Sequence, residues 1–114
     1  MRVVCASVEE FLKCLESEKT LLQDAVRISI FRNPMDGKNQ RDATKFKIIL
    51  QASAVVNIDE ESQYLLEVGK DCGRDIEDAE PTKEGTELAT ALKDQIEAFV
   101  VKRGWRVLPG TITF

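Results

Sequence analysis

The sequence predicts an α+β fold in which two helices pack on one face of a mostly antiparallel sheet of four to five strands. Two segments repeat apolar residues at helical spacing, and the three segments between them alternate apolar and polar residues as strands do. The connections between these strands are short, which favours antiparallel neighbours. One sheet face can bury both apolar helix stripes. We therefore expect the order β-α-β-β-β-α-β in a single domain, residues 1–114.

The N-terminal segment predicts a short strand followed by a helix. A β-branched run over residues 2–5 is typical of a strand. Ser7 and Glu10 then have the spacing of a capping box, in which the two side chains satisfy free N–H groups at the start of a helix. The next apolar residues fall at i, i+3, i+4 and i+7 and predict a helix over 8–20: Val8, Phe11, Leu12 and Leu15.

The middle of the chain predicts three strands. Val26, Ile28 and Ile30 alternate with polar neighbours and lead into the turn residues 33–37, which contain Pro34 and Gly37. A second strand is expected over 45–56 and a third over 64–68. The glycine-containing acidic segment 69–82 reads as a loop.

The C-terminal segment predicts a helix and a final strand. One apolar stripe follows residue 82: Leu88, Leu92, Ile96, Phe99 and Val100. Gly104 is expected to cap this helix at its C-terminal end. A last strand over 105–114 is interrupted at Pro109-Gly110, which is typical of an edge strand or a bulge.

Composition indicates a cytoplasmic, soluble protein without a membrane span. The net charge of −4 and pI near 4.9 argue against general attraction to nucleic acid or anionic membranes. The apolar run at the N-terminus is too short for a signal peptide, and no stretch of about 18 apolar residues exists. Three cysteines without patterned spacing fit reduced thiols.

The residue types present argue against an enzyme. Histidine is absent, which excludes a Ser-His-Asp triad, a Cys-His pair and a zinc site that uses imidazole. Gly37-Lys38 and Gly69-Lys70 lack the neighbours that a phosphate-binding loop requires. We therefore predict no catalytic residue, no cofactor and no metal. An acidic stretch could in principle supply oxygen ligands to a cation, but it lacks the spacing of a calcium loop and reads as a solvated loop: Asp71, Asp75, Glu77, Asp78 and Glu80.

One cysteine is a candidate reactive thiol. Cys72 lies in the expected loop beside Lys70 and Arg74, and nearby cations lower the pKa of a thiol. Asp71 and Asp75 act in the opposite direction, so the alternative is an incidental loop cysteine.

Charge is divided unevenly along the chain. Residues 57–87 hold eleven acids and three bases, whereas residues 27–50 hold six bases and two acids. The six bases form a candidate binding surface, the basic hairpin 27–47, on two adjacent strands and their connection: Arg27, Arg32, Lys38, Arg41, Lys45 and Lys47. An ordinary solvated surface is the plain alternative.

Three functional hypotheses follow. The leading one is a non-catalytic interaction or assembly module that binds a protein partner or a second copy of itself through strand edges and charge complementarity. The second is a nucleic-acid-binding accessory protein that uses the basic hairpin, with Phe31 as a stacking surface. The third is a small thiol-dependent enzyme based on Cys72. The expected element order resembles that of small ring-forming α+β proteins, such as those that close phage tails, and the likeness is one of fold order.

Overall fold

The chain forms a sheet with two helices, in the order that the sequence predicts. The computed structural model describes residues 2–17, 20–34, 46–57, 63–74 and 83–113. The elements along the chain are β1 (Arg2–Cys5), α1 (Val8–Glu16), β2 (Thr20–Leu21), β3 (Ala25–Pro34), β4 (Phe46–Asn57), β5 (Gln63–Arg74), α2 (Lys83–Lys102) and β6 (Arg106–Ile112). The predicted order is confirmed, with the two-residue strand β2 as an addition.

The five main strands form a mixed sheet in the order β1-β5-β4-β3-β6. The central strands β3, β4 and β5 are antiparallel neighbours, as their short connections predicted. Both edge strands pair in parallel, β1 with β5 and β6 with β3. A helix lies in each connection to or from an edge strand, and this helical crossover carries the chain back to the end of the sheet at which the preceding strand began. As a result β4 runs opposite to the other four.

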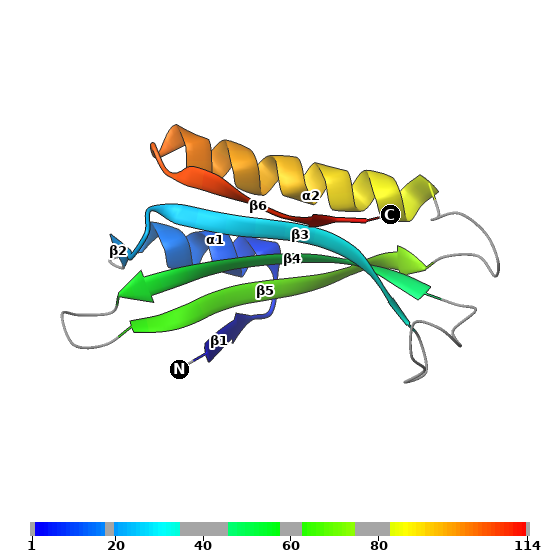
Figure 1. The fold of residues 1–114 in the computed structure, drawn as a ribbon, viewed down its shortest axis with the longest axis horizontal. Coiled ribbons are helices and arrows are strands. Elements are labelled where there is room, and N and C mark those ends of the chain that lie inside the picture. Colours follow the sequence, from blue (N-terminus) through cyan, green and yellow to red (C-terminus); the bar gives the residue numbers. More distant parts are fainter. Residues whose placement is uncertain (1, 18–19, 35–45, 58–62, 75–82, 114) are drawn as a thin grey trace.

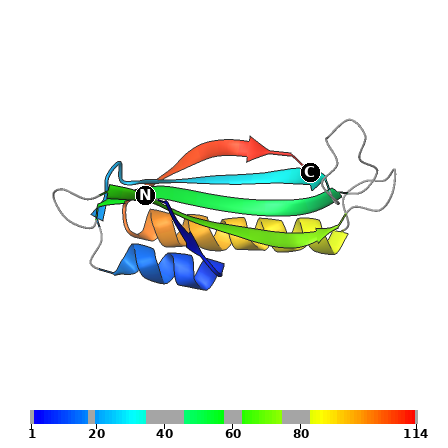
Figure 2. The same cartoon turned by 90° about the horizontal axis from the view of Figure 1, so that it is seen from below.

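Both helices cover the same face of the sheet (Figures 1 and 2). The strands bury alternate residues against them, which confirms the predicted packing. The core contains Phe11 and Leu15 of α1, Ala89, Ile96 and Val100 of α2, and the helix-facing side chains of the central strands: Val26, Ile28, Ile30, Ile48, Leu50, Ala52, Ala54, Val56, Leu66 and Val68. Neither described helix has both the length and the apolar character that crossing a membrane requires.

Side-chain and backbone caps define the ends of α1. The Oγ of Ser7 accepts from Glu10 N–H at 3.1 Å, as the predicted capping box requires. The Glu10 carboxylate also reaches back, but to Ala6 N–H at 2.7 Å, one residue before the N-cap. The helix ends at Glu16, four residues before the predicted end. There the Ser17 hydroxyl donates to Cys14 O at 2.9 Å, and the chain turns toward β2.

The third central strand is longer than the sequence predicts. β5 continues to Arg74, so the expected loop 69–82 is wrong over its first six residues. Gly69, Lys70 and Asp71 pair with successive residues of β4, and the register shifts by one residue before Gly73. Backbone pairing with β4 depends little on side-chain polarity, so these glycines and charged residues remain in the strand.

The C-terminal strand lies at an edge and is irregular, as Pro109-Gly110 predicted. Gly104 has φ +76 and ends α2, with Trp105 N–H donating to Val100 O at 3.1 Å. β6 then follows β3, and its register shifts between Ile28 and Ile30. At the shift, a Cβ on Gly110 would lie 2.2 Å from Ile28 O, so glycine is needed there.

Candidate association surface

The sheet face opposite the helices carries no layer of secondary structure in the described part of the chain (Figure 2). Side chains alternate between the two faces of a strand, which assigns to this open face the residues that do not face the helices. They include Arg2, Val4, Leu65, Glu67, Ala25, Arg27, Ser29, Phe31, Lys47, Ile49, Gln51, Ser53, Val55, Arg106 and Leu108. The face therefore mixes apolar, hydroxyl, amide and charged groups.

One cross-strand row of the open face spans all five strands. The pairing register places Val4 of β1 beside Glu67 of β5, Glu67 beside Ser53 of β4, Ser53 beside Arg27 of β3, and Arg27 beside Leu108 of β6. We call these five residues the central row. An acid and a base thus flank the small hydroxyl of Ser53 at equal distance, one strand away on either side.

Glu67 is a buried charge in this row. It is 5% exposed and is the one charged residue buried among the described residues. Its Oε1 accepts from the Nε of Arg2, whose own side chain is 67% exposed. The second carboxylate oxygen accepts no hydrogen bond from a described residue. A carboxylate withdrawn from water requires several partners to offset its lost hydration, and one guanidinium supplies only part of them.

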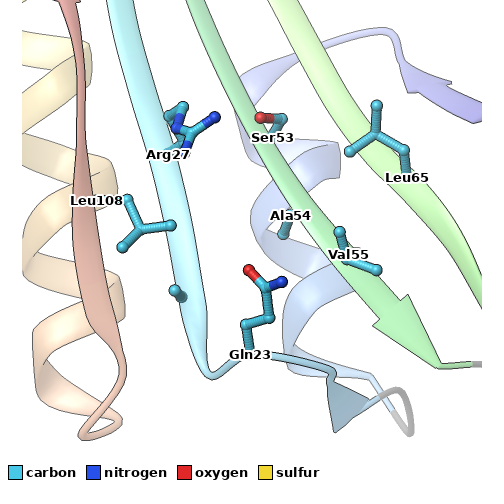
Figure 3. Close-up of a pocket in the computed structure, with 8 residues that line it drawn as sticks. Gln23, Arg27, Ser53, Ala54, Val55, Leu65 and Leu108 are labelled. Atoms are coloured by element: carbon cyan, nitrogen blue, oxygen red, sulfur yellow. The ribbon is translucent and has the colours of Figure 1, made fainter.

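Arg27 lies at the wall of a hollow in the open face. The hollow has a volume of about 120 Å³ and is shown in Figure 3. It is lined by Gln23, Ala25, Arg27, Ser53, Ala54, Val55, Leu65 and Leu108. Arg27 is exposed and makes no ion pair or side-chain hydrogen bond within the described ranges. A mostly apolar hollow with a guanidinium at its wall suits an apolar side chain that has an anionic neighbour.

The described members of the basic hairpin do not gather into one patch. β3 and β4 are adjacent, as predicted, but Arg27 pairs with Ser53, six residues along β4 from Lys47. That separation is about 20 Å at strand spacing. Arg32 lies five residues after Arg27 on β3, an odd spacing, so its side chain lies on the opposite, helix-facing side of the sheet. The remaining members, Lys38, Arg41 and Lys45, lie outside the described residues.

Cys72 is a buried strand residue and not a loop thiol. It lies in β5, is 5% exposed, and its thiol donates to Lys70 O at 3.5 Å. Burial raises the pKa of Cys72 more than the Leu50 backbone and Lys70 lower it. A thiol with a raised pKa is protonated at neutral pH and a poor nucleophile, which argues against the thiol-dependent enzyme.

The predicted acidic stretch is described only at Asp71. Residues 75–80 lie outside the described residues, so the solvated-loop interpretation stays a prediction. Within the described ranges, no three His, Cys, Asp or Glu side chains are grouped as metal ligands.

Sequence reasoning missed Arg2 and Glu67. The available signal was a single acid inside the apolar run Leu65-Leu66-Glu67-Val68. An acid at an inner strand position requires a partner, but only the parallel pairing of β1 with β5 identifies Arg2 as that partner.

Comparisons with protein-family models, with curated proteins and with solved structures found no match to this chain.

Proposed function

We propose that the protein is a non-catalytic association module that binds a second copy of itself through the open face. The observation that carries this proposal is the one-sided layering of the sheet (Figure 2). The uncovered face holds an arginine that makes no ion pair with a described residue, a buried carboxylate, and apolar side chains around a hollow. Apolar side chains near polar groups that lack partners are typical of surfaces that a protein partner covers.

The sheet edges support association less well than the face does. β1 is only four residues long. In β6, Arg106 N–H donates to Asp24 O at 2.7 Å, so Arg106 bonds toward β3. Alternate residues of a strand direct their backbone groups to opposite sides, which leaves Val107 and Pro109 on the free edge of β6. Pro109 has no N–H to offer an added strand. Short edge strands and proline are the devices by which proteins prevent edge-to-edge pairing.

The open face is large enough for a stable interface. β4 has 12 residues, which corresponds to a length of about 40 Å. Five strands span about 19 Å across the sheet. The resulting area, of the order of 700 Å², is close to the roughly 800 Å² that each partner buries in a standard interface.

The alternatives have less support in the described residues. A nucleic-acid surface needs cations that follow a phosphate backbone, and Arg27, Arg32 and Lys47 are dispersed over two faces. A thiol enzyme needs an ionised thiol, and burial raises the pKa of Cys72.

The solution mass, measured by light scattering over a concentration series, tests the proposal. We expect the mass to rise from one chain to two as concentration increases. Two valines provide a matched pair of variants, because Val4 on the open face and Val101 on α2 are each 64% exposed. Val4→Lys should weaken association because the interface must desolvate its ammonium group, whereas Val101→Lys should leave association unchanged. A single-chain mass at every concentration would overturn the proposal, and equal behaviour of the two variants would move the interface off the open face.

A further inference from the structure

We propose that two copies pack open face to open face about a two-fold axis along β4, so that Arg27 of each copy pairs with Glu67 of the other. This inference rests on the proposed function and specifies its geometry. Both copies then contribute the same surface to the interface, which is the isologous arrangement of most dimers.

The central row is complementary to its own reversal. From β1 to β6 it reads apolar, acid, hydroxyl, base, apolar: Val4, Glu67, Ser53, Arg27, Leu108. Reversal exchanges the acid with the base, sets an apolar residue against an apolar residue, and leaves Ser53 in the centre. A surface with this property can satisfy its charges with a second copy of itself.

A rotation about β4 performs this reversal. It places β3 of one copy over β5 of the other and β6 over β1, at the same level along the strands. Arg27 and Glu67 are each one strand, about 5 Å, from the axis. The angle of about 30° between packed sheets therefore displaces them by only about 2–3 Å. Packed sheets lie about 10 Å apart, a gap that an arginine and a glutamate side chain can fill together.

The alternative axis across the strands is unfavourable. It would place β3 over β3 and β5 over β5, so that Arg27 would lie near the partner's Arg27 and Glu67 near the partner's Glu67. Like charges brought together in an interface cost several kcal/mol. The charge order of the central row thus selects the axis along β4.

Among the described residues, Arg27 has no ion pair and Glu67 has only Arg2 at one of its two carboxylate oxygens, so a second copy would supply a further partner to each. Arg27 and Glu67 form no ion pair within one chain, since Ser53 of β4 separates them. Glu67 is buried and has one carboxylate oxygen without a described partner. A second guanidinium beside that of Arg2 would offset the cost of burying this carboxylate.

The inner positions of the neighbouring level show complementarity of shape. Its two ends, Arg2 on β1 and Arg106 on β6, are exposed cations that the rotation brings near each other at the rim, where solvent screens their repulsion. The open-face residues next to Glu67 and Arg27 on their strands are Leu65 and Ala25, and both line the hollow. Rotation about β4 sets Leu65 of one copy over Ala25 of the other, where a large side chain meets a small one. The hollow of about 120 Å³ beside Arg27 can thus receive a leucine from the second copy.

Charge reversal tests this geometry. Arg27→Glu alone creates two Glu–Glu contacts in each dimer, and Glu67→Arg alone creates two Arg–Arg contacts. A mixture of the two variants restores both opposite-charge pairs in a heterodimer. Close charge pairs contribute at least about tenfold each to affinity, so each single variant should lose about a hundredfold or more. The mixture should recover most of this loss.

Sedimentation equilibrium of each variant alone and of the equimolar mixture measures the outcome, with circular dichroism to verify folding. Lys102→Glu reverses an exposed charge on α2 and should associate as the unchanged protein does. Glu67→Gln serves if Glu67→Arg does not fold, and it should weaken the dimer by a smaller factor. Dimers that form equally well in Arg27→Glu and Glu67→Gln would overturn the geometry while leaving self-association intact. An unchanged protein that stays monomeric would overturn both.

Discussion

Gly110→Ala should destabilise the protein because it forces β6 away from β3. The ideal Cβ position at Gly110 lies 2.2 Å from Ile28 O and 2.2 Å from Ser29 Oγ. Real Cβ contacts are not shorter than 3.0 Å, so a displacement of at least 0.8 Å is required. Ser29 can rotate its hydroxyl away, but Ile28 O belongs to a backbone that also pairs with Ala52 of β4.

The expected loss of stability is large for one methyl group. Overpacking a rigid site costs about 1–3 kcal/mol, and backbone atoms on the receiving side favour the upper half of that range. A domain of this size has about 5–15 kcal/mol in total. With an m-value of about 1–3 kcal/mol/M in urea, the unfolding midpoint should fall by about 1–2 M without a change in m.

Gly69→Ala is the matched control for this measurement. Gly69 also lies in a strand, but no atom lies within 4 Å of its ideal Cβ and its φ is not positive. Alanine at this position lowers the conformational entropy of the unfolded chain, so it should raise the free energy of unfolding by at most about 1 kcal/mol. If both variants unfolded at the same urea concentration, the close approach of β6 to the Ile28 carbonyl at Gly110 would be refuted.

Two further predictions concern local features. Ser7→Ala should cost about 1 kcal/mol in urea unfolding because Glu10 N–H loses its acceptor, whereas Ser7→Asp should retain most of the stability. Burial raises the pKa of Cys72 above the ordinary 9.0, so the unfolded chain releases this proton first. Relative to Cys72→Ala, stability should be constant below about pH 9 and fall above it, since the unfolded state then binds fewer protons. Site-resolved alkylation at pH 8 should modify the partly exposed Cys14 before Cys72, and faster labelling of Cys72 would contradict its burial.

Local periodicity accounts for the elements that the sequence predicted well. The alternation of Val26, Ile28 and Ile30 placed one side of β3 in the core, and all three are buried. The spacing of Val8, Phe11, Leu12 and Leu15 did the same for α1. Such patterns are readable because burying an apolar side chain is favourable whichever neighbour covers it.

The extent of β5 could not be predicted in the same way. Gly69, Lys70 and Asp71 have the composition of a loop, and they extend the strand because β4 offers backbone partners at that level. For the same reason Cys72 is a buried thiol in a strand, although its neighbours in sequence suggested an accessible one. Pairing between strands satisfies backbone groups that the sequence pattern does not represent.

By itself, the sequence determined the helices, the central strands, the irregular final strand and the absence of histidine chemistry, since each of these depends on residue types or on spacing within one segment. Only the tertiary structure decided that both edge strands are parallel and that Arg27, Ser53 and Glu67 form one row across the sheet. Register between strands brings together residues far apart in the sequence, such as Ala25 with Arg106 and Arg2 with Glu67. The reason is physical: a side chain's neighbours across a sheet are set by backbone hydrogen bonds to other strands, and no periodicity within one strand encodes them.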